Sequence, residues 1–568
     1  MSIPTTSLLC TLAALVMLAS CESEHVDCNT APSVESLRVF GEEDVSDVAA
    51  LCTSHPLGVH IDRGIWIQDT QLQHLGLDCV CSVSDIVIKG NDKLVDLRGF
   101  DNLRTIRGGL RIVENARLET LQGLPSVETL GEFSGSSIYI DGNPMLRDLV
   151  GLPPNLLRLE GSLYIANNED LDGLDGLPSD VALINGGIKV ESNPNLQTLA
   201  GLPPTVEALE TLTISGNGRL TDLEGLPTGL RQIKGALWVT RNSSLTRLAG
   251  LPPLLTSIGE VHISSNDSLL DLSGFADDLT INGPLTIEYN DTLQNLGGLP
   301  EGLAVGKAVF DGHSLRVVSN KSLLDLSGLP ASLQSLPGGV LLYNTPVTNL
   351  DGLFDNLRVV HGLELIRNKH MQNLSGIPEG TTLNRDLLDW SLFIVDNDSL
   401  TSLAGLPSSL IALPGGISVV DNDSLPDLTG LEGVKSVDGN LYIGKRYPSN
   451  IGDPCDWSVQ VGGNANIQSL AGLSSIEEVS GDLVVACNPE LLGLDAFPKL
   501  EKVGGSLLLL DNEGLADLTG LGGVGGNLRT IEGTYGVRCS PQLDLAAVEA
   551  VTAEVTPPPT TSFQLVCP

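Results

Sequence analysis

The stretch Leu212–Leu226, with the sequence LTISGNGRLTDLEGL, carries the pattern that decides the fold. In general form the pattern is φ-x-φ-x-x-Asn-x-x-Leu-x-x-Leu-x-Gly-Leu, where φ is aliphatic, and the chain contains seventeen copies. Twelve of the sixteen intervals between copies are 24 or 25 residues long, and such a fixed period indicates a solenoid of stacked coils. The anchoring asparagines are Asn91, Asn115, Asn143, Asn168, Asn193, Asn217, Asn242, Asn266, Asn290, Asn320, Asn344, Asn368, Asn397, Asn422, Asn464, Asn488 and Asn512.

Each position of the pattern has a structural role. The alternating φ-x-φ unit predicts a short strand with two side chains inward and the middle one outward. A buried asparagine repeated in every coil can bond backbone groups that the following turn leaves unpaired. The leucines three and six positions later fill the interior, and Gly-Leu-Pro forms the next corner. A single coil cannot offset its own ordering entropy, so stacking and end caps must supply the remaining stability.

The amino-acid composition and net charge indicate an ordered protein and argue against some classes of partner. The 568 residues are 41% apolar and only 4% aromatic, which suits thin aliphatic layers in an ordered chain. The formal net charge of −39 argues against nucleic acid as a partner and against electrostatic docking on anionic membranes. We expect no cofactor and no metal. Acidic residues beside the ladder asparagines, such as Asp398 and Asp423, are interpreted as a solvated turn rather than a calcium site.

The N-terminus reads as an export signal. Residues 1–20 contain an apolar run, 8–19, that is too short to span a bilayer. The run ends in Leu18–Cys21 (LASC), which resembles the lipobox of bacterial lipoproteins, although no Lys or Arg precedes it. Cys21 would then be lipidated, 21–33 would be a tether, and the protein would be an outer-membrane lipoprotein. An ordinary cleaved signal and a secreted protein are the alternative.

The remaining cysteines lie only near the two ends of the chain. This placement predicts disulfides in an N-terminal cap, 34–82, and a C-terminal cap, 534–568, on either side of the regular coils at 83–533, because the end coils of a solenoid lack a neighbour. Sequence alone leaves the pairings open, and we favour Cys455 with Cys487 and Cys539 with Cys567. The eight candidates are Cys28, Cys52, Cys79, Cys81, Cys455, Cys487, Cys539 and Cys567.

The repeat resembles that of the receptor L domain family. The resemblance rests on the phrase itself and on an upstream glycine, as in Ile106–Ile112 (IRGGLRI), and covers most of residues 65–545. The family includes the ligand-binding L domains of insulin and epidermal growth factor receptors and many bacterial surface proteins, and leucine-rich repeats share its core. The resemblance implies an all-β, right-handed parallel β-helix of leucine-rich-repeat type, here of about 17 coils, with a non-catalytic binding role. Receptors have shorter L domains separated by cysteine-rich modules, so it implies a scaffold and no particular ligand.

The outward residue of φ-x-φ provides the first candidate site. In nine successive coils these residues would form a column on the sheet surface, and aromatic rings between polar groups are typical of recognition surfaces. Aromatic residues are also favoured on sheets for packing alone, and we weigh the two interpretations equally. The column reads Arg111, Tyr139, Tyr164, Lys189, Thr213, Trp238, His262, Thr286 and Arg316, of which Tyr139, Tyr164, Trp238 and His262 are the candidate ligand-binding residues.

Four longer coils provide the second candidate site. Their extra residues fall around 132–137, 304–313, 383–391 and 444–458, which we place in the corner just before the strand. Insertions at one phase of a solenoid project from one edge, often the binding edge. Two positions before the strand, where nine of seventeen coils have Gly, the inserted coils have His313, Trp390 and Trp457. These three residues join the list of candidate ligand-binding residues.

These features predict a non-catalytic scaffold that binds an extracellular protein or glycan and meets the membrane only through its lipid anchor. The eight histidines are scattered, and no nucleophile elbow, phosphate loop or His-x-x-x-His pair occurs, so we expect no enzyme. Two alternatives stay open: a structural envelope lipoprotein without a specific ligand, and a polysaccharide-degrading β-helix enzyme.

Overall fold

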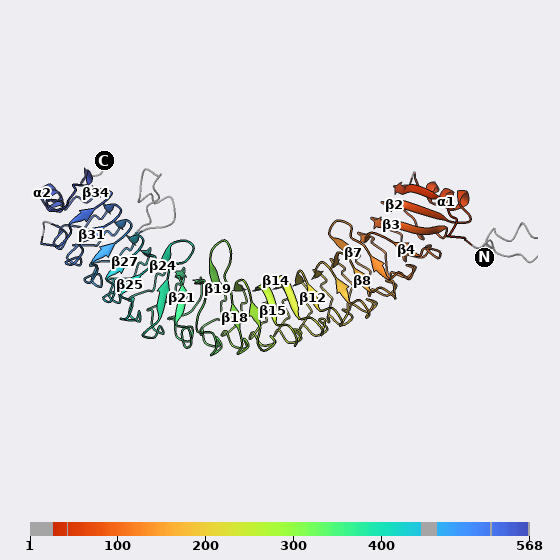
Figure 1. The fold of residues 1–568 in the computed structure, drawn as a ribbon, viewed down its shortest axis with the longest axis horizontal. Helices are drawn as coiled ribbons and strands as arrows, with labels where there is room; N and C mark the ends of the chain where they lie inside the picture. Colours follow the sequence, from red (N-terminus) through yellow and green to blue (C-terminus); the bar gives the residue numbers. More distant parts are fainter. Residues whose placement is uncertain (1–25, 43, 445–462, 523–524, 566–568) are drawn as a thin grey trace, which may run out of the picture.

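The chain folds into a parallel β-solenoid that curves into a long arc (Figure 1). The structure, a computed structural model, describes residues 26–42, 44–444, 463–522 and 525–565. The predicted all-β solenoid is confirmed, with about 20 turns instead of 17. The difference arises because strands on both sides of the seventeen asparagine coils pair in the same sheet, so the ends of the array are themselves coils.

One sheet of 25 strands runs the length of the molecule, and its strand pairs are all parallel. Its principal strands are β1 (Ser33–Phe40), β2 (Val59–Gln68), β3 (Val80–Lys89), β5 (Leu110–Val113), β7 (Ser136–Asp141), β9 (Ser162–Ala166), β11 (Ile188–Glu191), β13 (Leu212–Ser215), β14 (Gln232–Thr240), β15 (Ser257–Ser264), β17 (Leu285–Glu288), β19 (His313–Val318), β20 (Gly339–Tyr343), β22 (Leu363–Ile366), β24 (Trp390–Val395), β26 (Gly416–Val420), β28 (Leu441–Gly444), β30 (Leu483–Ala486), β32 (Leu507–Leu510), β34 (Thr534–Arg538) and β35 (Thr560–Gln564). We call this the main sheet.

A second, short strand precedes the principal strand in most coils and bends into it. These short strands are β4 (Thr105–Ile106), β6 (Thr129–Leu130), β8 (Arg158–Leu159), β10 (Leu183–Ile184), β12 (Ala208–Leu209), β16 (Thr280–Ile281), β18 (Ala304–Val305), β21 (Val359–His361), β23 (Thr382–Asn384), β25 (Ala412–Leu413), β27 (Ser436–Val437), β29 (Glu478–Val479), β31 (Lys502–Val503) and β33 (Thr530–Ile531). The helices are α1 (Val45–Ser54) and α2 (Leu545–Ala550), one near each end. Within the described ranges, neither helix has the length and apolar character needed to cross a membrane.

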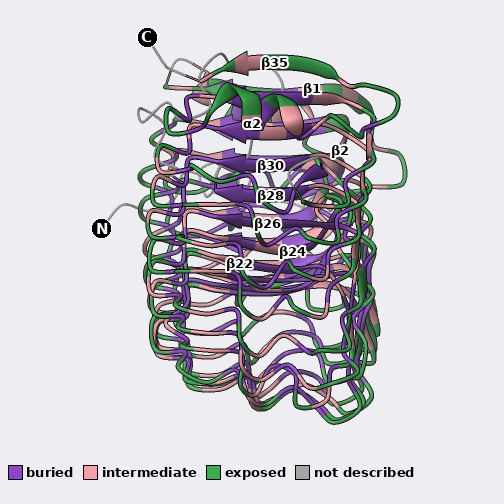
Figure 2. Cartoon of the chain, turned by 90° about the vertical axis from the view of Figure 1, so that its left-hand side faces the viewer, coloured by how far each residue is buried: buried purple, intermediate pink, exposed green. Residues whose placement is uncertain are grey.

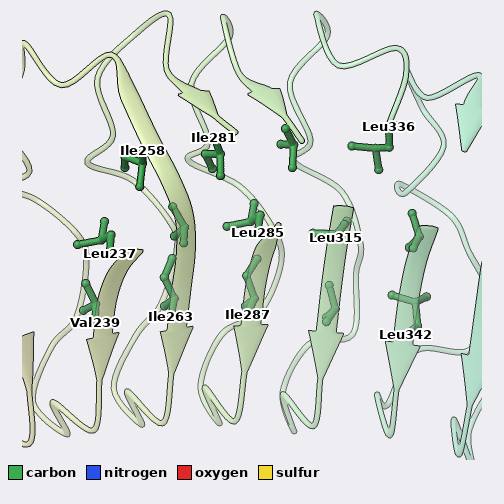
Figure 3. Packing of buried hydrophobic residues seen from close by; sticks show 14 of the residues in the cluster. Leu237, Val239, Ile258, Ile263, Ile281, Leu285, Ile287, Leu315, Leu336 and Leu342 are labelled. Atoms are coloured by element: carbon green, nitrogen blue, oxygen red, sulfur yellow. The ribbon is translucent and has the colours of Figure 1, made fainter. Parts of the chain in front are cut away.

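The core is a set of aliphatic rows that run along the arc. Strand register places Leu237, Val261, Leu285 and Leu315 in one row, because each pairs with the next across β14, β15, β17 and β19. Figure 3 shows Leu237, Leu285 and Leu315 pointing into the coil interior, and all four side chains of the row are at most 2% exposed. Figure 2 shows the same division, with buried residues on the strands and exposed residues at the turns. The φ-x-φ alternation therefore places its aliphatic side chains as predicted.

Close stacking of the coils explains the glycine of the pattern. Gly225 has φ of 103°, in the left-handed region that only glycine adopts readily. An added Cβ there would lie 2.2 Å from the backbone nitrogen of Ala200 in the preceding coil. A side chain at this corner would therefore force neighbouring coils apart.

The asparagines form a buried hydrogen-bonded ladder. The backbone N–H of Asn217 donates to Oδ1 of Asn242 at 3.0 Å, and the Asn193 N–H donates to Oδ1 of Asn217 at 3.1 Å. The Asn217 Nδ2 also donates to the carbonyl oxygen of Val190 at 2.9 Å, so one side chain ties together neighbouring coils. These asparagines are 0% exposed, with one exception.

The exception is Asn344, whose assignment to the ladder is wrong. Asn344 is exposed, and Thr345 occupies the buried position, where its N–H and Oγ1 donate to Oδ1 of Asn368 at 2.9 and 2.6 Å. Asn344 instead has φ of 53°, the left-handed conformation that the residue before the ladder position adopts in many other coils, as at Ser192 and Arg241.

The position predicted for the fourth insertion is also wrong. The strand of that coil is β28, which ends at Gly444, so the extra residues follow the strand and precede Asn464. The other three insertions do precede their strands, as predicted, because β7, β19 and β24 begin within one residue of their ends.

Disulfides are present near both ends of the molecule. Cys28 bonds to Cys81 and Cys52 bonds to Cys79, which cross-links the beginning of β3 to the segment before β1 and to α1. Cys487 and Cys539 are each disulfide-bonded. Their favoured partners, Cys455 and Cys567, lie outside the described residues, so those pairings stay predictions, as does lipidation of Cys21.

Candidate binding surface

The outward residues of the main sheet form one continuous column. Direct register partners run from Arg111 through Tyr139, Tyr164, Lys189 and Thr213, and then through Trp238, His262, Thr286 and Arg316. We call these nine residues the outward column. The structure brings together the four sequence-predicted candidates Tyr139, Tyr164, Trp238 and His262 on this surface, in two pairs.

The first pair is Tyr139 with Tyr164. The two rings stack with centroids 4.5 Å apart and an angle of 11°, and the guanidinium of Arg111 lies 4.0 Å from the Tyr139 ring centroid. The Tyr139 hydroxyl donates to Asp141 at 3.1 Å and the Tyr164 hydroxyl to Glu191 at 3.3 Å. Burial, and then the neighbouring carboxylates, raise the pKa of both phenols, so both stay neutral donors at physiological pH.

The second pair is Trp238 with His262. Their rings are nearly parallel, at 3°, with centroids 3.7 Å apart, and 37% of Trp238 is exposed. The His262 Nε2 lies 3.4 Å from Oε1 of Glu260. Burial lowers the pKa of His262 despite that carboxylate, so the imidazole is neutral at pH 7. The pair thus presents an uncharged, largely flat aromatic stack above the sheet.

His313, another candidate, is not on the surface. It is 3% exposed, and its Nε2 lies 3.1 Å from Oε1 of Glu364 while its Nδ1 lies 3.3 Å from Oδ2 of Asp311. Neither contact is aligned as a hydrogen bond. Burial alone would lower the pKa of His313, but Glu364 and then Asp311 outweigh burial and raise it. The placement of His313 at a binding edge is therefore wrong.

Asp386 completes this buried cluster. Its Oδ1 accepts hydrogen bonds from the backbone N–H groups of Leu388 and Trp390 at 2.8 and 2.7 Å. Burial, with a further contribution from the negative charge of Glu364, raises the pKa of Asp386 to about 6. We call His313, Glu364 and Asp386 the buried ionic cluster. Sequence reasoning missed Glu364 and Asp386, because nothing in the repeat indicates that these two carboxylates meet.

Trp390 is also buried, at 5% exposed, so it is a packing residue and its prediction as a projecting ring is wrong. It belongs to a small second hydrophobic cluster with Tyr442, Val484 and Leu510, separate from the coil interior. Its ring centroid lies 5.3 Å from that of Phe393 and 5.7 Å from that of Tyr442. Trp457 lies outside the described residues.

Two of the insertions meet above the main sheet. The loop 306–312 precedes β19 and the loop 385–389 precedes β24, with β20 and β22 between them in the sheet. An added Cβ on Gly312 would lie 2.8 Å from Cγ of Leu387, so the two loops are in contact. The available sequence signal is a run of apolar residues, such as Val309 and Phe310, inside a segment expected to project from the solenoid.

The acidic turn beside the ladder is partly neutralised by a lysine. Lys369 Nζ lies 2.8 Å from Oδ2 of Asp398 and also contacts Asp396. Among the residues that the structure describes, no group of three or more His, Cys, Asp or Glu is arranged to hold a metal ion.

Comparisons with known proteins give little beyond this geometry. No protein-family model matches the chain, and no curated protein matches it significantly. Among solved structures, a leucine-rich repeat protein from Bacteroides ovatus ATCC 8483 is similar at 13% identity over 72% of this chain and 82% of that one. The TM-score of that match is 0.27, too low for the two chains to superpose as one body, so the match carries no argument about function.

Proposed function

We propose that this protein is a non-catalytic recognition scaffold that binds an extracellular protein or glycan on the outward column of its main sheet. The observation that carries the proposal is the pair of aromatic stacks, Tyr139–Tyr164 and Trp238–His262, in a nine-residue column whose other members are polar. Flat aromatic rings give large contact area with little loss of side-chain entropy, which suits sugar rings and protein surfaces alike.

The polar neighbours of the aromatic rings also support a binding role for the outward column. Arg111 and Lys189 stand in the column beside the tyrosines. Glu260 lies beside His262, and Arg316 stands two coils further along the column. A rigid sheet with alternating aromatic and charged groups provides pre-positioned contacts, and pre-organisation lowers the entropic cost of binding. We further propose that Cys21 anchors the scaffold to the outer membrane so that this surface faces outward.

The test is a glycan array and an extracellular-protein array probed with the purified wild-type chain, each in parallel with a polysaccharide cleavage assay. Any retained ligand is then titrated against Trp238→Ala, Tyr164→Ala and the control Thr213→Ala, which lies in the same column. We expect the aromatic substitutions to cost about 2 kcal/mol or more in binding and the control to cost little.

Three outcomes would contradict the proposal. Equal binding by all variants would place the site elsewhere. Cleavage of a polysaccharide would favour the enzyme alternative. Failure to retain any ligand on either array would favour a structural envelope role.

A further inference from the structure

The two most exposed large apolar side chains of the described residues are consecutive. Val309 is 84% exposed and Phe310 is 95% exposed, both in the loop 306–312. The touching loop 385–389 adds Leu387 and Leu388, at 50% and 52%. We call these four residues the crest. Soluble proteins seldom keep a contiguous group of large apolar side chains in water unless the group meets a partner.

The crest stands on a built foundation. Beneath it the buried ionic cluster joins Asp386 of one loop, through Glu364 in β22, to His313 at the start of β19. Asp311 of the other loop lies 3.3 Å from His313 and also contacts Arg316 in the outward column. Asp311 therefore ties the loop 306–312 to the sheet by ion pairs, and the loop 385–389 rests on it through the contact of Leu387 with Gly312, with Asp386 against Glu364 below, while the apolar tips stay exposed. A loop that only connected two strands would need neither the buried polar contacts at its base nor the exposed apolar residues at its tip.

The position of the crest restricts what can reach it. The loops before β19 and β24 rise from the inner, concave side of the arc, and both ends of the arc extend beyond them (Figure 1). A flat bilayer would meet the two ends before it met the crest. An occupant must therefore be a compact body that fits between the arms.

Charge defines the occupant further. The chain has a formal net charge of −39. The crest loops themselves do not offset it, because they contain two basic residues, Lys307 and Arg385, against three acidic ones, and Arg385 is paired with Asp389 at 3.4 Å and with Asp438 at 3.2 Å. An acidic partner would be repelled and a basic one attracted, which raises the rate of productive encounter.

We propose that the crest is a second docking site, distinct from the aromatic stacks, for a compact basic protein that receives Val309 and Phe310 in an apolar pocket. Phe310 supplies the central anchor, Leu387 and Leu388 widen the apolar contact, and the acidic character of the chain selects the partner. The proposal does not depend on the outward column binding any ligand.

The experiment uses the full chain with the photo-reactive residue p-benzoylphenylalanine in place of Phe310, expressed in cells of its own species. A matched control carries the same residue in place of Leu324, which is 72% exposed on the turn after Asn320. Adducts are identified by mass spectrometry, and the captured protein is purified. It is then titrated against the wild-type chain, the double variant Val309→Ser/Phe310→Ser, and Leu324→Ser.

The proposal predicts a basic protein that is cross-linked from position 310 and not from 324. The double variant should raise the Kd at least tenfold, while Leu324→Ser and Trp238→Ala should leave it unchanged. Thermal melts of the double variant should match the wild type, because the substituted side chains are exposed. Equal adducts at both positions, an acidic partner, a lipid adduct, an adduct with a second copy of this chain, no adduct, or an unchanged Kd would each overturn it.

Discussion

At the scale of single residues, the ladder asparagine is the side chain that hydrogen-bonds neighbouring coils to one another. Asn217 links its own coil to both neighbours through its N–H, its Oδ1 and its Nδ2, and none of these groups can reach water. Removing one amide leaves buried backbone donors and acceptors without partners, which costs far more than the bonds themselves contribute in net terms.

We therefore expect Asn217→Ala to lower the free energy of unfolding by about 2–4 kcal/mol. Asn344→Gly is the matched control, because Asn344 is exposed and glycine accepts its left-handed φ. Chemical denaturation of both variants provides the measurement. Equal losses in the two variants would refute a special role for the ladder.

The buried ionic cluster predicts a dependence of stability on pH. The pKa of Asp386 is about 6 in the fold, above its ordinary value, so the folded state holds the proton more tightly than the unfolded state. This contribution is complete below about pH 4 and is lost as the pH rises through 6. Asn at this position keeps the oxygen that accepts from Leu388 and Trp390 but has no charge to bury.

Asp386→Asn should therefore gain stability relative to the wild type as the pH rises from 4 to 7.5, by about 1–3 kcal/mol. The measurement is the difference in Tm between the two proteins at each pH. A difference that does not change with pH would show that Asp386 is not a buried acid in the folded protein.

Residue-level prediction from the sequence succeeded where the period was strict and failed where the coil length changed. Asn344 was assigned because it lies 24 residues after Asn320, but one residue is missing from the turn that follows, so Thr345 takes the ladder position. His313 and Trp390 were placed on the surface because their insertions were expected to project freely. Instead His313 is buried against Glu364 and Trp390 against Tyr442, and such long-range contacts have no local sequence signal.

At the scale of elements, the end coils complete the stack. At the C-terminus β35 pairs with β34, and Phe563 packs edge-on against the fully buried Tyr535 with ring centroids 5.3 Å apart. The helix α2 contributes Val548, which is 0% exposed. Without these elements the last regular coil would present apolar side chains and open strand edges to water.

Deletion of residues 541–568 should therefore lower the Tm and promote aggregation. The control is deletion of 193–216, one complete coil that joins Ser192 to Asn217 in register and leaves both ends intact. We expect this control to remain soluble, with a smaller change in Tm measured by circular dichroism. If both deletions melt alike, the end coils have no special protective role.

At the scale of the whole molecule, the proposed anchor decides where the arc is displayed. Leu18–Cys21 predicts that Cys21 is lipidated after removal of residues 1–20. In a bacterial host the wild-type chain should partition into the detergent phase, and Cys21→Ala should become soluble or accumulate unprocessed. Mass spectrometry of the mature N-terminus checks this, and an unacylated terminus at another residue would contradict the prediction.

The general architecture could be predicted from the sequence because each coil repeats the same local rules. Alternating aliphatic residues define the inward rows, and Gly225 and its equivalents allow one coil to approach the next. The number of coils was underestimated because strands at both ends of the array pair in the main sheet without an anchoring asparagine. Thr70 stands at the ladder position before Asn91, and Ser540 stands at it after Asn512. The crest could not be predicted, since it depends on a contact between loops that are separated by two strands of the sheet.

The contact between Gly312 and Leu387 also has a mechanical consequence. A solenoid in which each coil contacts only the next one bends by many small movements between coils, spread evenly along its length. Between β19 and β24 the two loops reach over β20 and β22. The coils of these strands therefore cannot separate without breaking the contact between Gly312 and Leu387. The arc therefore has a stiff middle section between two more compliant arms. When the molecule flexes, the arms swing toward or away from each other while the middle section keeps its shape.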